Sequence, residues 1–88
     1  MINNRETYKV PVPIAPGETL QESIDLLQIS PAALAEKTAV SVDYVQRVLA
    51  GKARITPEFA TALTQVVDVP AAFWLRYDQN YHQALAEQ

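Results

Sequence analysis

Polar and cationic side chains are concentrated in one segment of this 88-residue chain, between Ser30 and Thr56. The segment contains four cations and two anions, a local net charge of +2, whereas the rest of the chain has three cations and eight anions, a net charge of −5. Hydroxyl, amide and cationic groups follow one another within it: Ser41, Tyr44, Gln46, Arg47, Lys52 and Arg54. Such groups hydrogen-bond to base edges and phosphate oxygens, so their chemistry suits a polyanionic partner.

Residues for other kinds of chemistry are sparse. The chain has no cysteine and a single histidine, His82, so we predict no metal site and expect His82 to face solvent. The two glycines stand at expected helix boundaries rather than in a phosphate-binding loop. Ser30, Ser41 and Thr56 fit helix caps better than nucleophiles. We therefore predict a protein that is not an enzyme and has no cofactor.

The composition predicts one small soluble domain. A chain of 88 residues with 49% hydrophobic residues can bury a single core. The lack of cysteine suits a reducing compartment, and no apolar run approaches the roughly 20 residues that span a bilayer. The N-terminus, MINNRETYKV, has no hydrophobic centre of a signal peptide. We expect a cytoplasmic protein with no membrane contact.

The hydrophobic period indicates which elements position the polar segment. From Gly17 onward the apolar residues recur with the spacing of helices. Serine or threonine before proline marks two helix starts, and Gly51 marks one helix end. These signals predict an all-α fold, a domain over residues 17–88 with five helices at about 17–28, 31–38, 42–50, 57–67 and 70–86.

Residues 1–16 predict an extended N-terminal arm. They include Pro11, Pro13 and Pro16, which do not fit inside a helix. Apolar residues alternate between the prolines, as in an edge strand or a polyproline-like segment. Two interpretations stay open: a tail packed on its own domain, and an arm that pairs with a partner as an added strand.

Apolar stripes predict the core. Leu20, Ile24 and Leu27 share one face of the first helix. The last helix is expected to complete the core with three consecutive residues, Phe73, Trp74 and Leu75. Further along, its apolar side chains extend beyond the expected core, and tyrosine suits half-wet interfaces. We assign these residues to a dimer interface: Tyr77, Tyr81 and Leu85.

The second and third predicted helices, joined by a tight turn at 38–41, have the pattern of a helix-turn-helix. Their inward positions are apolar: Leu34, Ala35, Val40, Val45, Val48 and Leu49. The third helix then presents an outward face that can enter a DNA major groove. With the preceding serine and two loop cations, this face is the predicted DNA-binding surface: Ser41, Val42, Asp43, Tyr44, Gln46, Arg47, Lys52 and Arg54.

A second function class fits the same pattern. A helical hairpin with surface cations is common in small all-α domains, so the chain could be a protein-interaction module that binds DNA weakly or not at all. Asp43 is a residue whose chemistry suits the protein-interaction function better than DNA binding. It stabilises the dipole at the start of its helix, yet in a groove it repels phosphate or needs a cytosine amino group. We interpret Asp43 as a capping residue.

Three segments give the chain a resemblance to a known family: PGETLQESIDLLQIS, PAALAEKTAVSVDYVQRVLAGKARITPEFATAL and VPAAFWLRYDQNYHQALA. They resemble the Xre-type helix-turn-helix antitoxins of the HigA (VapI-like) group, over Pro16 to about Ala86. The resemblance implies a five-helix lambda-repressor-like fold and a homodimer that binds a palindromic operator and represses its own promoter. In antitoxin members it also implies neutralisation of a RelE-like RNase toxin.

The chain departs from this family at three positions. Pro31 stands where a DNA-contacting glutamine is common, Ala33 replaces a capping-box glutamate, and Ala39 replaces the usual turn glycine. A left-handed Ala39 would cost about 1 kcal/mol. These departures favour the interaction module as the alternative function. The ending NYHQALAEQ also resembles longer relatives, so the chain is either a complete regulator or the N-terminal domain of one.

Overall fold

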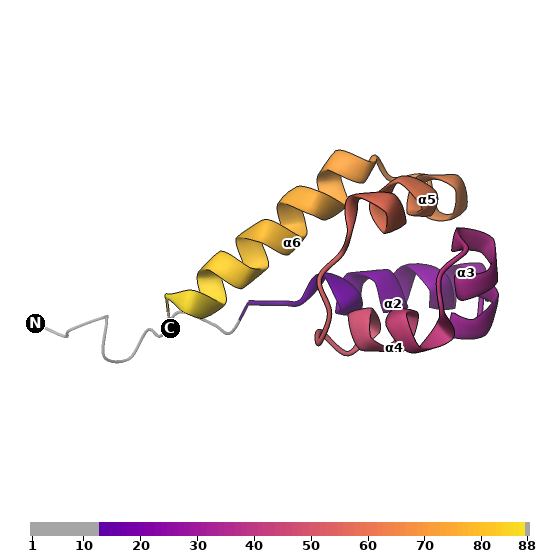
Figure 1. The fold of residues 1–88 in the computed structure, drawn as a ribbon, viewed down its shortest axis with the longest axis horizontal. Helices are drawn as coiled ribbons and strands as arrows, with labels where there is room; N and C mark the ends of the chain where they lie inside the picture. Colours follow the sequence, from indigo (N-terminus) through magenta and orange to yellow (C-terminus); the bar gives the residue numbers. More distant parts are fainter. Residues whose placement is uncertain (1–12, 88) are drawn as a thin grey trace, which may run out of the picture.

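The computed structural model describes residues 13–87 and consists of helices joined by short loops (Figure 1). These residues form α2 (Pro16–Leu27), α3 (Pro31–Thr38), α4 (Val42–Leu49), α5 (Pro57–Val67) and α6 (Ala71–Ala86). Over residues 13–87 the predicted all-α fold with its five helices is confirmed. The observed helix ends lie within one residue of the predicted ones.

Most of the predicted N-terminal arm, residues 1–12, lies outside the described residues. Residues 13–15 have no regular secondary structure. Pro16 was expected in the arm but is the first residue of α2. Proline is accepted there because the first N–H groups of a helix have no partner within the helix.

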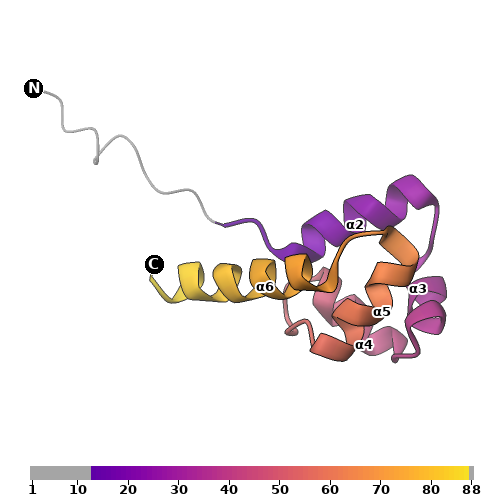
Figure 2. The same cartoon turned by 90° about the horizontal axis from the view of Figure 1, so that it is seen from above.

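The five helices enclose one core, to which each of them contributes. Figures 1 and 2 show α2 to α5 grouped together, with α6 running outward from this group toward the C-terminus. The buried apolar side chains include most of the core residues predicted above, together with Ile55 and three residues of α5: Leu20, Ile24, Leu34, Ala35, Val45, Val48, Ile55, Phe59, Ala60, Leu63 and Trp74.

Hydroxyl caps begin three of the helices, as the sequence predicts. The side-chain oxygens of Ser30, Ser41 and Thr56 each accept a hydrogen bond from the backbone N–H three residues further on, at 3.0–3.1 Å. Each cap satisfies a donor that the helix itself cannot pair. The starts of α3, α4 and α5 are therefore fixed by local sequence.

The end of α2 corrects one predicted core residue. Leu27 is 50% exposed. The next residue, Gln28, is left-handed with φ 61°, and the Ile29 N–H donates to the Ile24 carbonyl at 2.8 Å. This Schellman reversal turns the chain back over the helix end. Ile29 therefore packs against the core in place of Leu27.

The turn between α3 and α4 has the same construction. Ala39 is left-handed with φ 60°, and the Val40 N–H donates to the Ala35 carbonyl at 3.1 Å. Val40 packs against the core, as predicted. The strained conformation expected at Ala39 is thus present, and it sets the direction in which α4 leaves the turn.

The start of α6 corrects a second predicted core residue. Trp74 is fully buried and Leu75 packs beside the core, but Phe73 is 47% exposed. Successive helical residues are about 100° apart around the axis, so three in a row cannot all face one core. Phe73 lies at the margin, with its ring edge-to-face against those of Trp74 and Tyr77.

Candidate nucleic-acid interface

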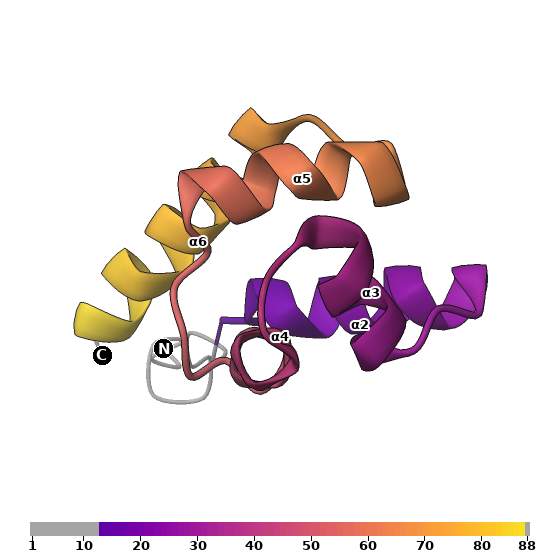
Figure 3. The same cartoon turned by 45° about the vertical axis from the view of Figure 1, so that its right-hand side comes forward.

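The helix pair α3 and α4 has the arrangement of a helix-turn-helix, with the second helix at the surface. α4 buries Val45 and Val48 and half-buries Leu49 against the core. Figure 3 views α4 end-on at the lower edge of the molecule, with no other described helix beyond it. One side of α4 therefore anchors the helix and the other faces outward.

The outward side of α4 carries four of the predicted DNA-binding residues. They are all exposed: Val42, Asp43, Gln46 and Arg47. Residues four apart lie one above the other on a helix, so these side chains form two adjacent rows. The amide of Gln46 and the guanidinium of Arg47 are thus placed where a groove-bound helix presents base-reading groups.

Arg47 is paired along the helix rather than free. Its Nε donates to Asp43 Oδ2 at 3.0 Å, and the two side chains are 54% and 76% exposed. An exposed pair of this spacing contributes about 0.3–0.5 kcal/mol, so a phosphate or base can displace Asp43 at small cost. Asp43 also lies in the first turn of α4, in agreement with the capping role assigned to it.

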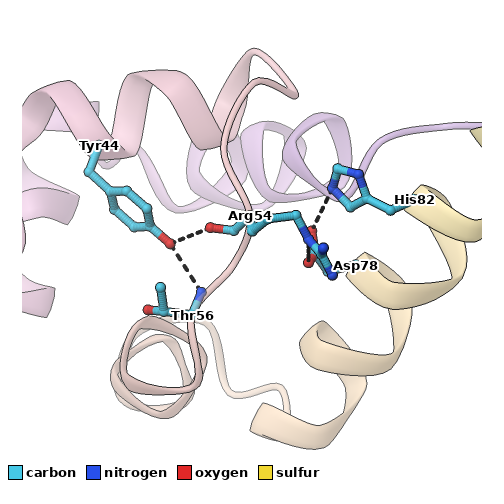
Figure 4. Close-up of polar contacts among 5 residues, drawn as sticks. All are labelled: Tyr44, Arg54, Thr56, Asp78 and His82. Carbon is cyan, nitrogen blue, oxygen red and sulfur yellow. Dashed lines mark hydrogen bonds and ion pairs between the residues drawn. The ribbon is translucent and has the colours of Figure 1, made fainter.

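Tyr44 does not point outward as predicted. Its hydroxyl donates to the Arg54 carbonyl at 2.6 Å and accepts from the Thr56 N–H at 3.1 Å (Figure 4). Its ring meets Phe59 edge-to-face, with centroids 5.2 Å apart. The tyrosine therefore fastens the loop before α5 to α4. Its side chain turns inward because the loop offers both an unpaired acceptor and an unpaired donor.

Arg54, predicted as a phosphate-contacting cation, is also paired within the chain. Its Nε donates to Asp78 Oδ2 at 2.7 Å, and His82 Nε2 lies 3.4 Å from Asp78 Oδ1 (Figure 4). Asp78 is 3% exposed although it is an acid in α6. His82 is half-buried, so the expectation that it faces solvent is wrong. It is drawn inward by the carboxylate one helical turn earlier.

The two remaining members of the predicted surface, Ser41 and Lys52, lie at the ends of α4. Ser41 is exposed, and its hydroxyl is engaged in capping the helix. Lys52 is exposed in the loop that follows Gly51, whose positive φ of 77° ends the helical path. Ser41 and Lys52 are thus exposed at either end of the helix whose outward side carries Gln46 and Arg47.

The residues assigned to a dimer interface differ in their exposure. Tyr77 is half-buried, with its hydroxyl 2.9 Å from Thr19 Oγ1 of α2. Tyr81 is also half-buried and lies beside Gly51. Leu85 is 37% exposed, near the projecting end of α6. The two tyrosines thus join α6 to its own chain, and Leu85 is the most accessible of the three.

Two other kinds of site, a membrane-spanning helix and a metal centre, have no counterpart in residues 13–87. None of the helices there is both long and apolar enough to cross a membrane. The same residues hold no cluster of three or more potential metal-ligating side chains.

In the described part of the chain, five short helices surround one core and the second helix of a helix-turn-helix faces outward. This arrangement defines a lambda-repressor-like helix-turn-helix protein. No protein-family model matches the chain. It is 34% identical over 73 residues to YddM of Escherichia coli K12, an uncharacterized HTH-type transcriptional regulator, with 83% of this chain and 78% of YddM covered.

The chain is also similar to solved structures of HigA proteins. HigA antitoxin of Pseudomonas aeruginosa with the higBA promoter is 36% identical with a TM-score of 0.79, over 84% of this chain and 82% of HigA. A HigA-family addiction module antidote protein of Coxiella burnetii is 31% identical with a TM-score of 0.77, over 86% and 84%. The chain belongs to the Xre-type helix-turn-helix regulators and antitoxins of the HigA family.

Proposed function

We propose that this protein is a transcriptional repressor that binds a double-stranded DNA operator through α4. The observation that carries the proposal is the exposure of Gln46 and Arg47 on the outward side of a helix-turn-helix. The similarity to a HigA solved with its promoter supports it. In this proposal α4 enters the major groove, and Lys52 and Arg54 contact the flanking phosphates.

The repressor acts as a homodimer, because a single short helix reads too few base pairs to define an operator. We place the dimer surface on the projecting part of α6, around the exposed Leu85. The half-buried Tyr81 and Tyr77 lie one and two helical turns before it. Two copies would then read two half-sites related by the symmetry of the dimer. Sedimentation of wild type and of Leu85→Arg tests this point, since a charge in the interface should shift the protein toward monomer.

A second proposed property concerns a protein partner. We propose that the protein also neutralises a RelE-like RNase toxin, supported by its similarity to antitoxins and to an addiction module antidote protein. Its named relatives are bacterial, so the proposal places it with the chromosome in the cytoplasm. Co-expression with the neighbouring gene product should yield a stable complex. If the neighbouring gene product is toxic but does not bind the protein, the antitoxin activity is refuted. The proposal of DNA binding is then unaffected.

The DNA-binding proposal is tested with a fluorescent fragment of the protein's own promoter. Binding should weaken steeply as salt rises, because each phosphate contact releases counterions. Arg47→Ala should weaken operator binding by about 1–3 kcal/mol and relax the sequence preference, because it removes a base-reading group. Arg76→Ala, which removes an exposed cation from α6, is the control and should bind like wild type. A salt-independent signal, or none, would favour the interaction module instead.

A further inference from the structure

Asp78 is a buried acid whose partners are drawn from two parts of the chain. Its carboxylate accepts from Arg54 Nε at 2.7 Å on one oxygen and lies 3.4 Å from His82 Nε2 on the other (Figure 4). The residue is 3% exposed. Removing the partner of a buried carboxylate is strongly unfavourable, so Arg54 is held at this place by the fold.

Arg54 is fixed at a second point by α4. The Tyr44 hydroxyl donates to the Arg54 backbone carbonyl at 2.6 Å. The backbone of Arg54 is thus hydrogen-bonded to α4, the helix that carries Gln46 and Arg47. The side chain of Arg54 is hydrogen-bonded to α6. This double attachment sets where the guanidinium stands relative to α4.

The contact with Asp78 leaves most of the guanidinium available. An arginine has five N–H donors, and the bond to Asp78 uses the one on Nε. The side chain of Arg54 remains 61% exposed. The four donors on the terminal nitrogens form the planar fork that binds phosphate oxygens in pairs.

We propose that Asp78 is a positioning residue for DNA binding, which holds Arg54 by Nε so that its terminal N–H groups meet an operator phosphate. The inference rests on the proposed function. The proposal and simple electrostatics predict opposite effects of removing the Asp78 carboxylate. By charge alone, Asp78 repels DNA, so its removal should raise the affinity for DNA. If Asp78 positions Arg54, its removal should lower that affinity.

The test is the affinity of Asp78→Asn for the promoter fragment across a range of salt concentrations. This substitution removes one negative charge and keeps the shape of the side chain. It replaces the charge-assisted bond from Arg54 Nε with a weaker bond to a neutral acceptor at most. If Asp78 positions Arg54, affinity falls about fivefold to tenfold and the salt slope shrinks by about 1, as for a lost phosphate contact. Tighter binding with an equal or steeper slope would overturn the inference.

A double-mutant cycle separates positioning from a general effect on the fold. Arg54→Gln should lower affinity as far as Asp78→Asn does. Asp78→Asn added to Arg54→Gln should then change affinity by less than about twofold, since the group it positions is already gone. Independent, additive losses would overturn the inference.

Arg54→Lys decides the question if Asp78→Asn does not fold, as judged by circular dichroism. Lysine keeps the charge and a partner for Asp78, but its three donors sit on one nitrogen. It therefore lacks the separate planar pair of N–H groups that arginine presents to a phosphate while Nε holds Asp78. Folded Arg54→Lys should therefore lose affinity as Arg54→Gln does, and wild-type affinity would overturn the inference. Failure of wild type to bind would refute the proposed function as well.

Discussion

Gly17 of α2 meets the backbone of α4 so closely that it has no room for a side chain. A Cβ placed on Gly17 would lie 2.1 Å from the Val48 carbonyl oxygen and 2.7 Å from that of Leu49. The first helix of the domain therefore supports the last turn of the helix that presents Gln46 and Arg47. The angle at which α4 faces outward therefore depends on a glycine that lies 25 residues before the first residue of that helix, Val42.

Gly17→Ala should destabilise the protein by about 1–3 kcal/mol, because the methyl group forces α2 and α4 apart. For a domain of this size that corresponds to a fall in Tm of roughly 4–8 °C per kcal/mol. Glu22→Ala, at an exposed position in the interior of the same helix, is the control and should leave Tm within a degree or two. An unchanged Tm for Gly17→Ala would show that the helices do not pack this closely in solution.

Tyr44→Phe should destabilise the protein by about 1–3 kcal/mol, because it leaves the Arg54 carbonyl and the Thr56 N–H without their shared partner. The ring should stay against Phe59, so the helix remains folded. Urea unfolding measures the loss, and hydrogen exchange should speed up at the Thr56 amide. Tyr77→Phe removes a comparable hydroxyl bonded to Thr19 and should leave exchange at Thr56 unchanged.

The helix starts could be predicted because their signals are local. Ser30, Ser41 and Thr56 cap the helices that the sequence assigns to them, and each hydrogen bond spans three residues. The buried side of α4 was equally predictable, since Val45 and Val48 follow the helical period. Signals contained within one turn of helix were therefore sufficient to place the starts of α3, α4 and α5 and the buried side of α4.

The inward contacts of the candidate site could not be predicted in this way. Asp78 and Arg54 are 24 residues apart, and no period in the sequence links them. Tyr44 occupies a position that is outward by spacing, yet its long side chain reaches the loop before α5. Such pairings depend on how the helices pack, which fixes where a side chain finds a partner. Within α6, the spacing of four residues between Asp78 and His82 was the one pattern in the sequence that indicated a contact between these two side chains.

Ala39→Gly should stabilise the protein by about 0.5–1 kcal/mol. Ala39 is exposed and left-handed with φ 60°, a conformation that glycine adopts without strain. The greater freedom of glycine in the unfolded chain offsets part of the gain. Ala62→Gly, within α5, makes the same chemical change in a helix interior and should destabilise by about 0.5–1 kcal/mol. Urea midpoints that move in the same direction for both variants would contradict the assigned role of Ala39.

Asp43→Asn should raise the affinity for random-sequence DNA about fivefold, because it removes a negative charge from the outward side of α4 and releases Arg47 from its pair. Stability should fall by less than about 1.5 kcal/mol, the sum expected for an exposed ion pair and a helix-dipole contact. Asp25→Asn, an exposed position in α2, changes the net charge equally and is the control.

The operator then distinguishes the two roles of Asp43. If the residue only caps α4, Asp43→Asn should tighten binding to the operator as much as to random DNA, because nothing specific is lost. If its carboxylate accepts a hydrogen bond from a cytosine amino group, affinity for the operator should fall while affinity for random DNA rises. We expect the first result, since Asp43 lies in the first turn and is already paired with Arg47. Equal affinities for Asp43→Asn, Asp25→Asn and wild type would show that α4 does not face the DNA.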